Sequence, residues 1–486
     1  MFTRVLWRGR SFHGVLFGLG LAAIAARRAE ETGTGEDGGQ RRRKGPGAYS
    51  RAVERSREHL RRVKDEVGSP GIVVGVSIDG EAVWTEGLGF ADVENRVLCT
   101  ADSVMRVASI SKSFTMAALA KLWEEGKLDL DAPVQKYVPE FPEKEFEGEK
   151  VTITTRLLVS HMSGIRHYEK DIQKIRNKLA NKSLELGSPA GQKHVTDKTK
   201  PYTEQEREVK SKDNKEQNLK VSRKCNVQEP EEFYIKKKYD TVIDSLDLFK
   251  NDPLVFKPGT QFLYSTHAWT LLSAIVERAS EQKFLDYMLN MFRTLGMKNT
   301  VPEEHEPIIY NRARYYSFNH KKRLVNSPYV DNSCKWAGGG FLSTINDLLL
   351  FGNVLLYSYQ TQDAPHLLPG YLKPETISMM WSQVPNTEMS WDKDGKYAMG
   401  WGTVERKQEY GQCKYQRHYV SHTGGAVGAS SVILILPEEE IPTKMKNQSV
   451  IPPKGIVVTI IANMQGTGLN STALKIALEF EKEKSA

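Results

Sequence analysis

The chain has 486 residues, of which 39% are hydrophobic and 26% are charged. These values are ordinary for a soluble protein with a substantial core. The net charge of +8 arises mainly from the N-terminal segment and a lysine-rich stretch near 190–240, so it does not predict nucleic-acid binding. The widely separated Cys99, Cys225, Cys334 and Cys413 are expected to be buried thiols. No cofactor and no metal site are predicted.

Residues 1–47 have the composition of a targeting segment followed by a linker. Five arginines and no acidic residue occur in residues 1–29, as is typical of a mitochondrial presequence. The apolar run Gly14–Ala26 is shorter than the roughly 20 residues that cross a bilayer, so no stable transmembrane span is predicted. A bipartite signal for the mitochondrial intermembrane space is favoured, and a secretory signal peptide is the alternative. Residues 30–47 are predicted to be a disordered linker.

The folded body is predicted to occupy residues 48–486 as a single domain. Valine and leucine recur at helical spacing over residues 53–67, which predicts a helix. Two β-rich runs follow, Gly71–Ile78 and Glu81–Thr85, separated by Asp79-Gly80. An Asp-Gly pair between such runs is a strong hairpin signal.

The C-terminal part mirrors this beginning. Ala429–Leu436 and Ile456–Ala462 are predicted strands, and Leu474–Glu483 is a predicted closing helix. We therefore expect an α+β fold, in which both chain ends build one antiparallel sheet flanked by helices. A helical region is inserted in the middle.

Residues 169–250 differ from the rest of the domain. Lysine, glutamate, glutamine and asparagine dominate, and apolar periodicity is lost. We interpret the stretch as a charged, largely disordered insertion, with a partner-binding arm as the alternative.

A serine and a lysine lie three residues apart at the predicted start of another helix. Residues at i and i+3 share a helix face, so Lys112 can reach the hydroxyl of Ser109. A serine hydroxyl becomes a good nucleophile when a base removes its proton, and a buried lysine can be that base. The pair alone is weak evidence, because a capping serine with a solvated lysine has the same spacing.

Five segments together resemble the serine β-lactamase and penicillin-binding-protein superfamily, specifically its class C-like branch of the peptidase S12 type. They occur in the family's order and cover nearly all of residues 50–480 outside the insertion. The segments are Ser109-Ile-Ser-Lys112, Leu157–Ile165, Phe256–Thr266, Trp336–Asp347 and His422-Thr-Gly-Gly425.

The resemblance implies that this single domain is catalytic, with its active site between the helical region and the sheet, and it implies a role for each matching residue. Ser109 would form the acyl-enzyme, while Lys112 and Tyr264 would share the proton transfers, with the identity of the base left open. The backbone N–H groups of Ser109 and Gly425 would form the oxyanion hole.

The remaining matched positions, Thr266, His422, Thr423 and Gly424, would bind substrate. Thr266 replaces the family's asparagine, and His422 replaces its lysine. Thr266 lacks the carboxamide that can bind a substrate's amide, and histidine is expected to titrate near neutrality, where lysine would carry a fixed charge. Both changes argue against efficient β-lactam hydrolysis, which depends on binding a carboxylate.

The leading hypothesis is a mitochondrial serine peptidase or amidase that acts on peptides or proteins. An esterase-like acyl hydrolase is the second hypothesis. The third is a polymerising scaffold of the intermembrane space with weak or no catalysis, because the resemblance also implies a homo-oligomer or filament.

Overall fold

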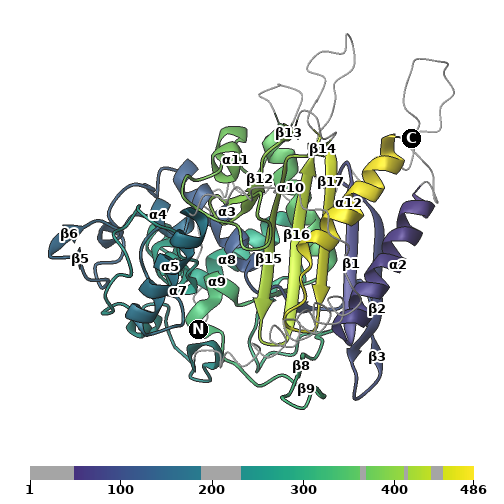
Figure 1. The fold of residues 1–486 in the computed structure, drawn as a ribbon, viewed down its shortest axis with the longest axis horizontal. Helices are drawn as coiled ribbons and strands as arrows, with labels where there is room; N and C mark the ends of the chain where they lie inside the picture. Colours follow the sequence, from purple (N-terminus) through teal and green to yellow (C-terminus); the bar gives the residue numbers. More distant parts are fainter. Residues whose placement is uncertain (1–48, 188–230, 362–367, 410–413, 439–452, 486) are drawn as a thin grey trace, which may run out of the picture.

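The computed structural model describes residues 49–187, 231–361, 368–409, 414–438 and 453–485. The predicted targeting segment and linker lie outside the described residues, as do Cys225 and Cys413. Cys99 and Cys334 are buried free thiols, as predicted. The described chain has the expected α+β architecture, with a large antiparallel sheet beside a helical region (Figure 1).

The main sheet has eight strands drawn from both ends of the domain. Its order is β11 (Lys396–Tyr397), β12 (Gly402–Val404), β15 (Tyr419–Ala426), β16 (Ala429–Pro437), β17 (Gly455–Ala462), β1 (Gly71–Ile78), β2 (Glu81–Asp92) and β3 (Val97–Leu98). The N-terminal β1 pairs with the C-terminal β17 in register from Ile72↔Ala462 to Ile78↔Ile456. This pairing confirms that both chain ends contribute to one sheet.

The β1–β2 hairpin turns at the predicted dipeptide. Asp79 and Gly80 have φ angles of 52° and 84°, and Ile78 pairs with Glu81 across the turn. Two consecutive positive φ angles are typical of a type I′ turn, whose twist matches that of the flanking strands.

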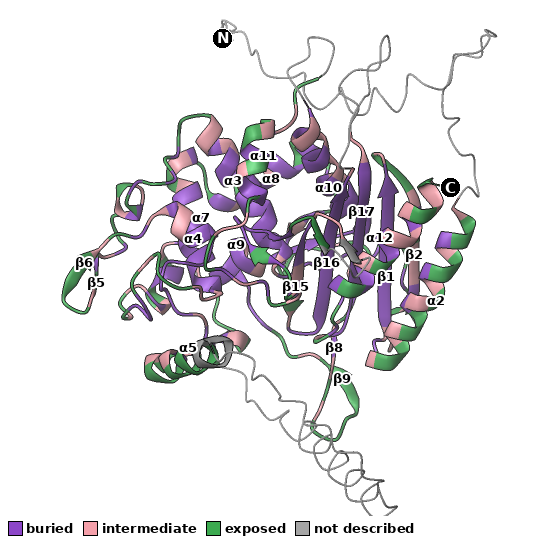
Figure 2. Ribbon diagram, turned by 45° about the horizontal axis from the view of Figure 1, so that its top comes forward, coloured by how far each residue is buried: buried purple, intermediate pink, exposed green. Residues whose placement is uncertain are grey.

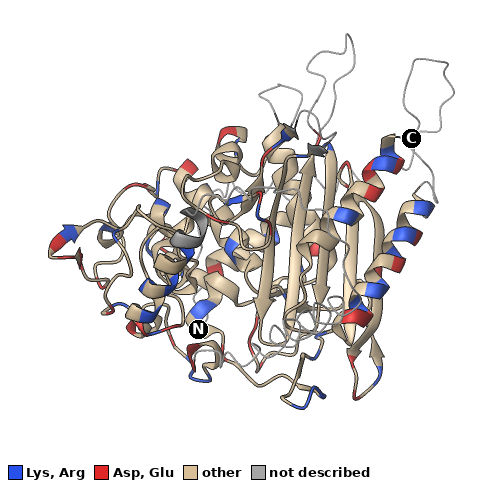
Figure 3. Cartoon of the chain, in the orientation of Figure 1, with Lys and Arg blue, Asp and Glu red and all other residues tan. Residues whose placement is uncertain are grey.

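Helices cover both faces of this sheet. α2 (Ser50–Val67) and α12 (Asn470–Ser485) pack together on one face, where Leu60 and Phe480 join a core with Trp84. Their outer surfaces carry many of the charged residues (Figure 3). α10 (Ile345–Gln360) packs on the opposite face. Strands β1, β16 and β17 are consequently buried along their whole length (Figure 2).

The helical region packs beside the sheet around one central helix. That helix, α3 (Ile110–Glu124), is buried without interruption from Ile110 to Ala120, so it has no solvent face there. It packs against α7 (Thr266–Ser280), α8 (Phe284–Leu295) and α9 (Trp336–Gly339). The helical region also contains α4 (Thr155–Val159), α5 (Ile172–Gly187) and α11 (Pro374–Trp381).

Short strands and 3₁₀ turns complete the domain. A small sheet has the order β4 (Met105–Arg106), β10 (Phe341–Ser343) and β7 (Val301–Pro302). Three hairpins are formed by β5 (Lys144–Phe146) with β6 (Glu149–Val151), β8 (Tyr316–Phe318) with β9 (Leu324–Asn326), and β13 (Lys407–Glu409) with β14 (Lys414–Gln416). The 3₁₀ turns are η1 (Val134–Lys136), η2 (Glu231–Tyr234), η3 (Asp244–Leu248) and η4 (Ser333–Lys335).

The prediction of a largely disordered insertion is wrong at both ends of residues 169–250. α5 begins at Ile172, and Ile175 packs against Val255 and Phe256. After the undescribed residues 188–230, η2 and η3 return the chain to the domain, where Phe249 joins the main core. A few apolar anchors therefore suffice to fix these charged segments. In the parts of the chain that the structure describes, no helix is long and apolar enough to cross a membrane.

Candidate active site

Ser109 lies where the chain enters the central helix. It is the N-cap of α3, directly before the first helical residue, whereas the sequence predicted a place in the first turn. Its side chain makes no capping hydrogen bond. The preceding Ala108 has a φ angle of 48°, a left-handed conformation that is uncommon outside glycine. Such local strain is typical of functional sites. Because no cap occupies the hydroxyl, it remains available for chemistry.

Lys112 is one polar partner of that hydroxyl. Its Nζ lies 3.1 Å from Ser109 Oγ and donates a hydrogen bond of 2.6 Å to the carbonyl of Gly338 in α9. The side chain is fully buried. Burial, followed by repulsion from Lys335, lowers the pKa of Lys112 well below its usual value. No carboxylate among the described residues pairs with this amine, so it readily exists in its neutral, basic form.

Tyr264 is brought to the same point by the segment before α7. Its ring centroid is 4.9 Å from Lys112 Nζ, and its hydroxyl shares a hydrogen bond with the side chain of Ser109. Burial raises the pKa of Tyr264, and that hydrogen bond offsets the rise only in part. The phenol therefore keeps its proton at neutral pH. The structure thus unites the three residues predicted to be catalytic.

The ring of His161 packs against that of Tyr264, a contact that the sequence did not predict. The ring centroids of the two residues are 4.2 Å apart, and His161 Nδ1 accepts a hydrogen bond of 3.0 Å from the backbone N–H of Ser265. Burial, then the charge of Lys112, lowers the pKa of His161 well below its usual value. The uncommon φ angle of 61° at this residue was not recognisable from the motif that contains it.

Strand β15 forms the opposite wall of the site. β12 pairs only with Tyr419–Ser421, so in the described chain the edge of β15 beyond Ser421 has no neighbouring strand. A Cβ atom on Gly424 would lie 2.3 Å from the carbonyl oxygen of Val107, whereas one on the exposed Gly425 would meet no atom within 4 Å. Only glycine therefore allows the strand to pack this tightly against the chain that leads into Ser109, while Gly425 stays open.

The backbone N–H of Ser109 fits the predicted oxyanion-hole role. Among the described residues it has no hydrogen-bond acceptor, and it lies at the N-terminus of a long helix. Free N–H groups and the helix dipole favour developing negative charge at such a position.

Two predicted substrate-binding residues are buried. Thr266 is 5% exposed, and a Cβ on Gly338 would lie 2.6 Å from its methyl group, so Thr266 packs behind the site. His422 has no exposed surface; its Nδ1–H donates to the carbonyl of Thr423 and its Nε2 accepts from the hydroxyl of Tyr397.

The expectation that His422 titrates near neutrality is therefore wrong. Burial, then the charge of Lys112, lowers the pKa of His422 to about 3, so the ring is neutral. The half-buried Thr423 and the buried Gly424 remain on the strand that borders the site.

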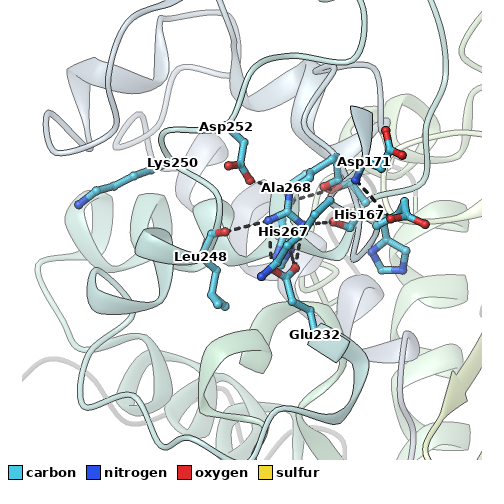
Figure 4. A network of polar contacts seen from close by, with 12 residues as sticks. His167, Asp171, Glu232, Leu248, Lys250, Asp252, His267 and Ala268 are labelled. Atoms are coloured by element: carbon cyan, nitrogen blue, oxygen red, sulfur yellow. Dashed lines mark hydrogen bonds and ion pairs between the residues drawn. The ribbon is translucent and has the colours of Figure 1, made fainter. Parts of the chain in front are cut away.

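A buried ionic network supports the helical side of the site (Figure 4). Glu232, in η2, accepts hydrogen bonds from Arg166 and from His267 Nε2, at 2.7 and 2.8 Å for its Oε2. Burial opposes ionisation of Glu232, but the hydrogen bonds from His267 and Arg166 outweigh it and lower its pKa to about 2. His267 directly follows Thr266 in α7. The network therefore connects η2 to α7, next to the segment that carries Tyr264. No local sequence pattern indicated this contact.

The described residues contain no cluster of three or more histidine, cysteine, aspartate or glutamate side chains placed to hold a metal ion. The chemistry that this geometry offers is acyl transfer by an activated serine, with a buried amine as base and a phenol as proton donor.

Comparisons with known proteins agree with this geometry. A sequence profile described as "Beta-lactamase" matches residues 57–197 and 213–479. The mitochondrial serine β-lactamase-like protein LACTB of Homo sapiens is 64% identical over 450 residues, covering 90% of this chain and 81% of that protein. The Mus musculus protein of the same name is 61% identical over 462 residues, covering 90% and 82%.

Solved structures with the same fold are much more distant in sequence. A class C β-lactamase has 14% identity and a TM-score of 0.58, with 89% of this chain and 96% of that chain covered. An octameric penicillin-binding protein homologue from Pyrococcus abyssi has 22% identity and a TM-score of 0.59, with 88% and 77% covered. The chain thus belongs to the β-lactamase family and, within it, to the mitochondrial serine β-lactamase-like LACTB proteins.

Proposed function

We propose that this protein is a serine hydrolase that cleaves peptide or protein amide bonds through an acyl intermediate on Ser109. The observation that carries the proposal is the 3.1 Å contact between Ser109 Oγ and the buried Nζ of Lys112. A buried amine without a carboxylate partner is neutral near neutral pH far more often than a solvated lysine is, so it is available to take the proton of Ser109. Family membership supports the same reaction class.

In the first step, Ser109 Oγ attacks the substrate carbonyl while its proton passes to the neutral Lys112. The contrasting pKa shifts favour Lys112 as the base, because the pKa of Tyr264 is raised and its phenol is protonated. The negative charge on the carbonyl oxygen is stabilised by the N–H groups of Ser109 and Gly425. Tyr264 donates its proton to the leaving nitrogen and regains one from Lys112.

In the second step, a water molecule gives its proton to the same base and attacks the acyl carbonyl. The Ser109–acyl bond breaks, the hydroxyl recovers a proton, and the carboxylate product leaves. Microscopic reversibility assigns the same groups to both steps.

Two observations favour an amide over an ester. An amine leaves only when it is protonated, and Tyr264 supplies a proton donor at the nucleophile. In the part of the chain that the structure describes, no strand pairs with the edge of β15 beyond Ser421, so an extended peptide can add its backbone there as a strand.

Matched peptide substrates that differ only in an amide or ester at the scissile bond test this proposal. We expect turnover of both by the full-length protein and loss of both in Ser109→Ala. The control is Ser163→Ala, which removes another buried serine hydroxyl, outside the Ser109-Ile-Ser-Lys112 segment. Turnover of the ester alone would support the esterase alternative, and no dependence on Ser109 would refute both hydrolase proposals.

The proposed location is the mitochondrial intermembrane space. It rests on the cationic, acid-free composition of residues 1–29 and on the names of the mitochondrial relatives. Protease should digest the protein only after the outer mitochondrial membrane is ruptured, whereas N-glycosylation would contradict the proposal.

Assembly into a homo-oligomer or filament stays a prediction of the resemblance. Electron microscopy of the purified protein over a range of salt concentrations tests it, and a strictly monomeric protein would contradict it.

A further inference from the structure

The two proposed oxyanion-hole donors belong to segments that are far apart in sequence. Ser109 is the third residue after β4, whereas Gly425 lies near the end of β15, just before the turn of Val427 and Gly428 that leads into β16. An oxyanion hole stabilises charge efficiently when both N–H groups are held in place before the charge develops. Contacts between these two segments therefore bear directly on the proposed reaction.

Arg106 connects the two segments through its side chain. It is the last residue of β4 and is only 5% exposed. Its Nη1 donates a hydrogen bond to the carbonyl of Val427, in the turn that follows the second donor. The carbonyl of the next residue, Val107, accepts a hydrogen bond of 2.7 Å from Ser431 in β16. The chain that leads into Ser109 is thus bonded to the turn and to the strand beyond it.

An ion pair fixes the direction of this guanidinium. Its Nε lies 2.9 and 2.7 Å from the two carboxylate oxygens of Glu303, which is 3% exposed. The same carboxylate accepts a hydrogen bond of 2.7 Å from Asn332, and the backbone N–H of Glu303 donates one of 2.8 Å to the carbonyl of Gly340. Glu303 is therefore itself fixed, and it holds the guanidinium toward Val427.

Tyr315 packs against one face of the guanidinium. Its ring centroid lies 4.1 Å from Arg106 Cζ, and its hydroxyl accepts a hydrogen bond of 3.0 Å from the backbone N–H of Arg106. Gly428 has a φ angle of 72°, and a Cβ atom on it would lie 2.6 Å from Tyr315 Cβ. The turn thus contacts the residue that stacks on Arg106. A planar guanidinium can donate to two acceptors and stack on a ring, which a lysine ammonium cannot do in this geometry.

Stability alone does not explain this buried pair. Replacing a buried ion pair by apolar residues of similar volume is often neutral or stabilising, because removing two charges from water costs about as much free energy as their attraction supplies. What the pair adds is a fixed distance between β4 and the turn that connects β15 to β16.

From this arrangement we infer that Arg106 is a positioning residue, which sets the separation of the backbone N–H groups of Ser109 and Gly425. The inference rests on the proposed hydrolase function and adds to it a buried residue that does not touch the substrate. Arg106 keeps both donors within hydrogen-bonding distance of the same carbonyl oxygen. Its contribution grows as negative charge develops on that oxygen, so it affects kcat more than KM.

Arg106→Lys tests the inference on two matched peptide esters, one with oxygen and the other with sulfur in the scissile carbonyl group. Sulfur is larger and is a weaker hydrogen-bond acceptor, so correctly placed N–H groups favour oxygen. We expect the variant to lower kcat for the oxygen ester by roughly 10- to 100-fold, with KM within about twofold of the wild-type value. The ratio of kcat for the oxygen ester over the sulfur ester should also fall, because misplaced donors distinguish the two atoms poorly.

A double variant decides the question if Arg106→Lys does not fold. Arg106→Met combined with Glu303→Met removes both charges, so it should melt at a higher temperature than Arg106→Met alone, which leaves the charge of Glu303 buried without its counter-ion. The double variant should show the same losses in kcat and in the preference for oxygen.

The matched control is Arg57→Met combined with Glu86→Met. Arg57 Nε likewise contacts both carboxylate oxygens of Glu86, at 2.9 and 2.8 Å. This pair joins α2 to β2, which contribute no residue to the site, so kcat and the preference for oxygen should keep their wild-type values.

The outcomes separate this inference from the proposed function. An unchanged kcat in a folded variant would overturn the inference, as would equal losses on both esters or the same losses in the control. A shifted pH dependence of kcat would also overturn it, since Arg106 would then act through the proton transfers of Lys112. By contrast, a wild-type protein that turns over neither ester and forms no fluorophosphonate adduct on Ser109 would refute the proposed function.

Discussion

Gly424→Ala tests how tightly β15 is held against the chain that carries Ser109. The new Cβ would lie 2.3 Å from the carbonyl oxygen of Val107 and 2.1 Å from Ser431 Oγ. Ser431 cannot rotate away without cost, because its hydroxyl donates a hydrogen bond of 2.7 Å to the same carbonyl. Since ordinary contacts begin near 3.4 Å, strand and loop must separate by about 1 Å.

This separation sets the expected magnitudes. Overpacking of a filled site costs about 1–3 kcal/mol in the free energy of unfolding. A displacement of about 1 Å between catalytic groups lowers rates by up to roughly 100-fold. We therefore expect Gly424→Ala to unfold at lower urea concentration and to acylate Ser109 about 10- to 100-fold more slowly, as measured by fluorophosphonate labelling.

Gly425→Ala is the matched control for stability. Both substitutions remove the same backbone freedom from the unfolded chain, but a Cβ at Gly425 meets no atom within 4 Å. The free energy of unfolding of Gly425→Ala should stay within about 0.5 kcal/mol of the wild-type value. The packing described for β15 is refuted if Gly424→Ala is as stable as Gly425→Ala and labels at the wild-type rate.

Three further predictions concern the groups around the nucleophile. Tyr264→Phe should slow peptide turnover by about 100- to 10,000-fold in stopped assays, and an unchanged rate would exclude the phenol as proton donor. Because the pKa of His422 is lowered to about 3, unfolding takes up a proton between about pH 6.5 and 3, and stability falls as the pH falls. His422→Gln should reduce that loss by at most about 1.4 kcal/mol per pH unit in urea unfolding at pH 6.5 and 4.5; identical slopes would contradict a buried neutral ring. Glu232→Gln should cost about 3–5 kcal/mol and speed hydrogen exchange in residues 231–250, whereas the neighbouring, exposed Glu231→Gln should change neither; equal effects would count against the buried pair.

Local patterns predicted the frame of the fold well. The β1–β2 hairpin follows from an Asp-Gly pair between β-rich runs, and its turn has the expected positive φ angles. The terminal helices and strands show their periodicity within short windows. The Ser109–Lys112 contact was predictable for the same reason, since it depends only on the geometry of one helical turn.

Features that depend on tertiary packing were not predictable. The neutrality of His422 depends on its burial and on the charge of Lys112, and its ring nitrogen is bonded by the hydroxyl of Tyr397 from another strand. The fixed segment after residue 230 depends on Glu232 meeting Arg166 and His267, far away in sequence. Composition alone therefore classified the two described ends of this charged stretch as disordered, although a few apolar and ionic contacts anchor them.

The most direct test of the central claim is mass spectrometry of the full-length protein after reaction with a fluorophosphonate. We predict a single covalent adduct on Ser109, formed faster as the pH rises and Lys112 loses its proton. Lys112→Met should slow its formation by about 100- to 10,000-fold. An adduct on another residue, no adduct, or an undiminished rate in Lys112→Met would contradict the assignment of Ser109 as nucleophile and Lys112 as its base.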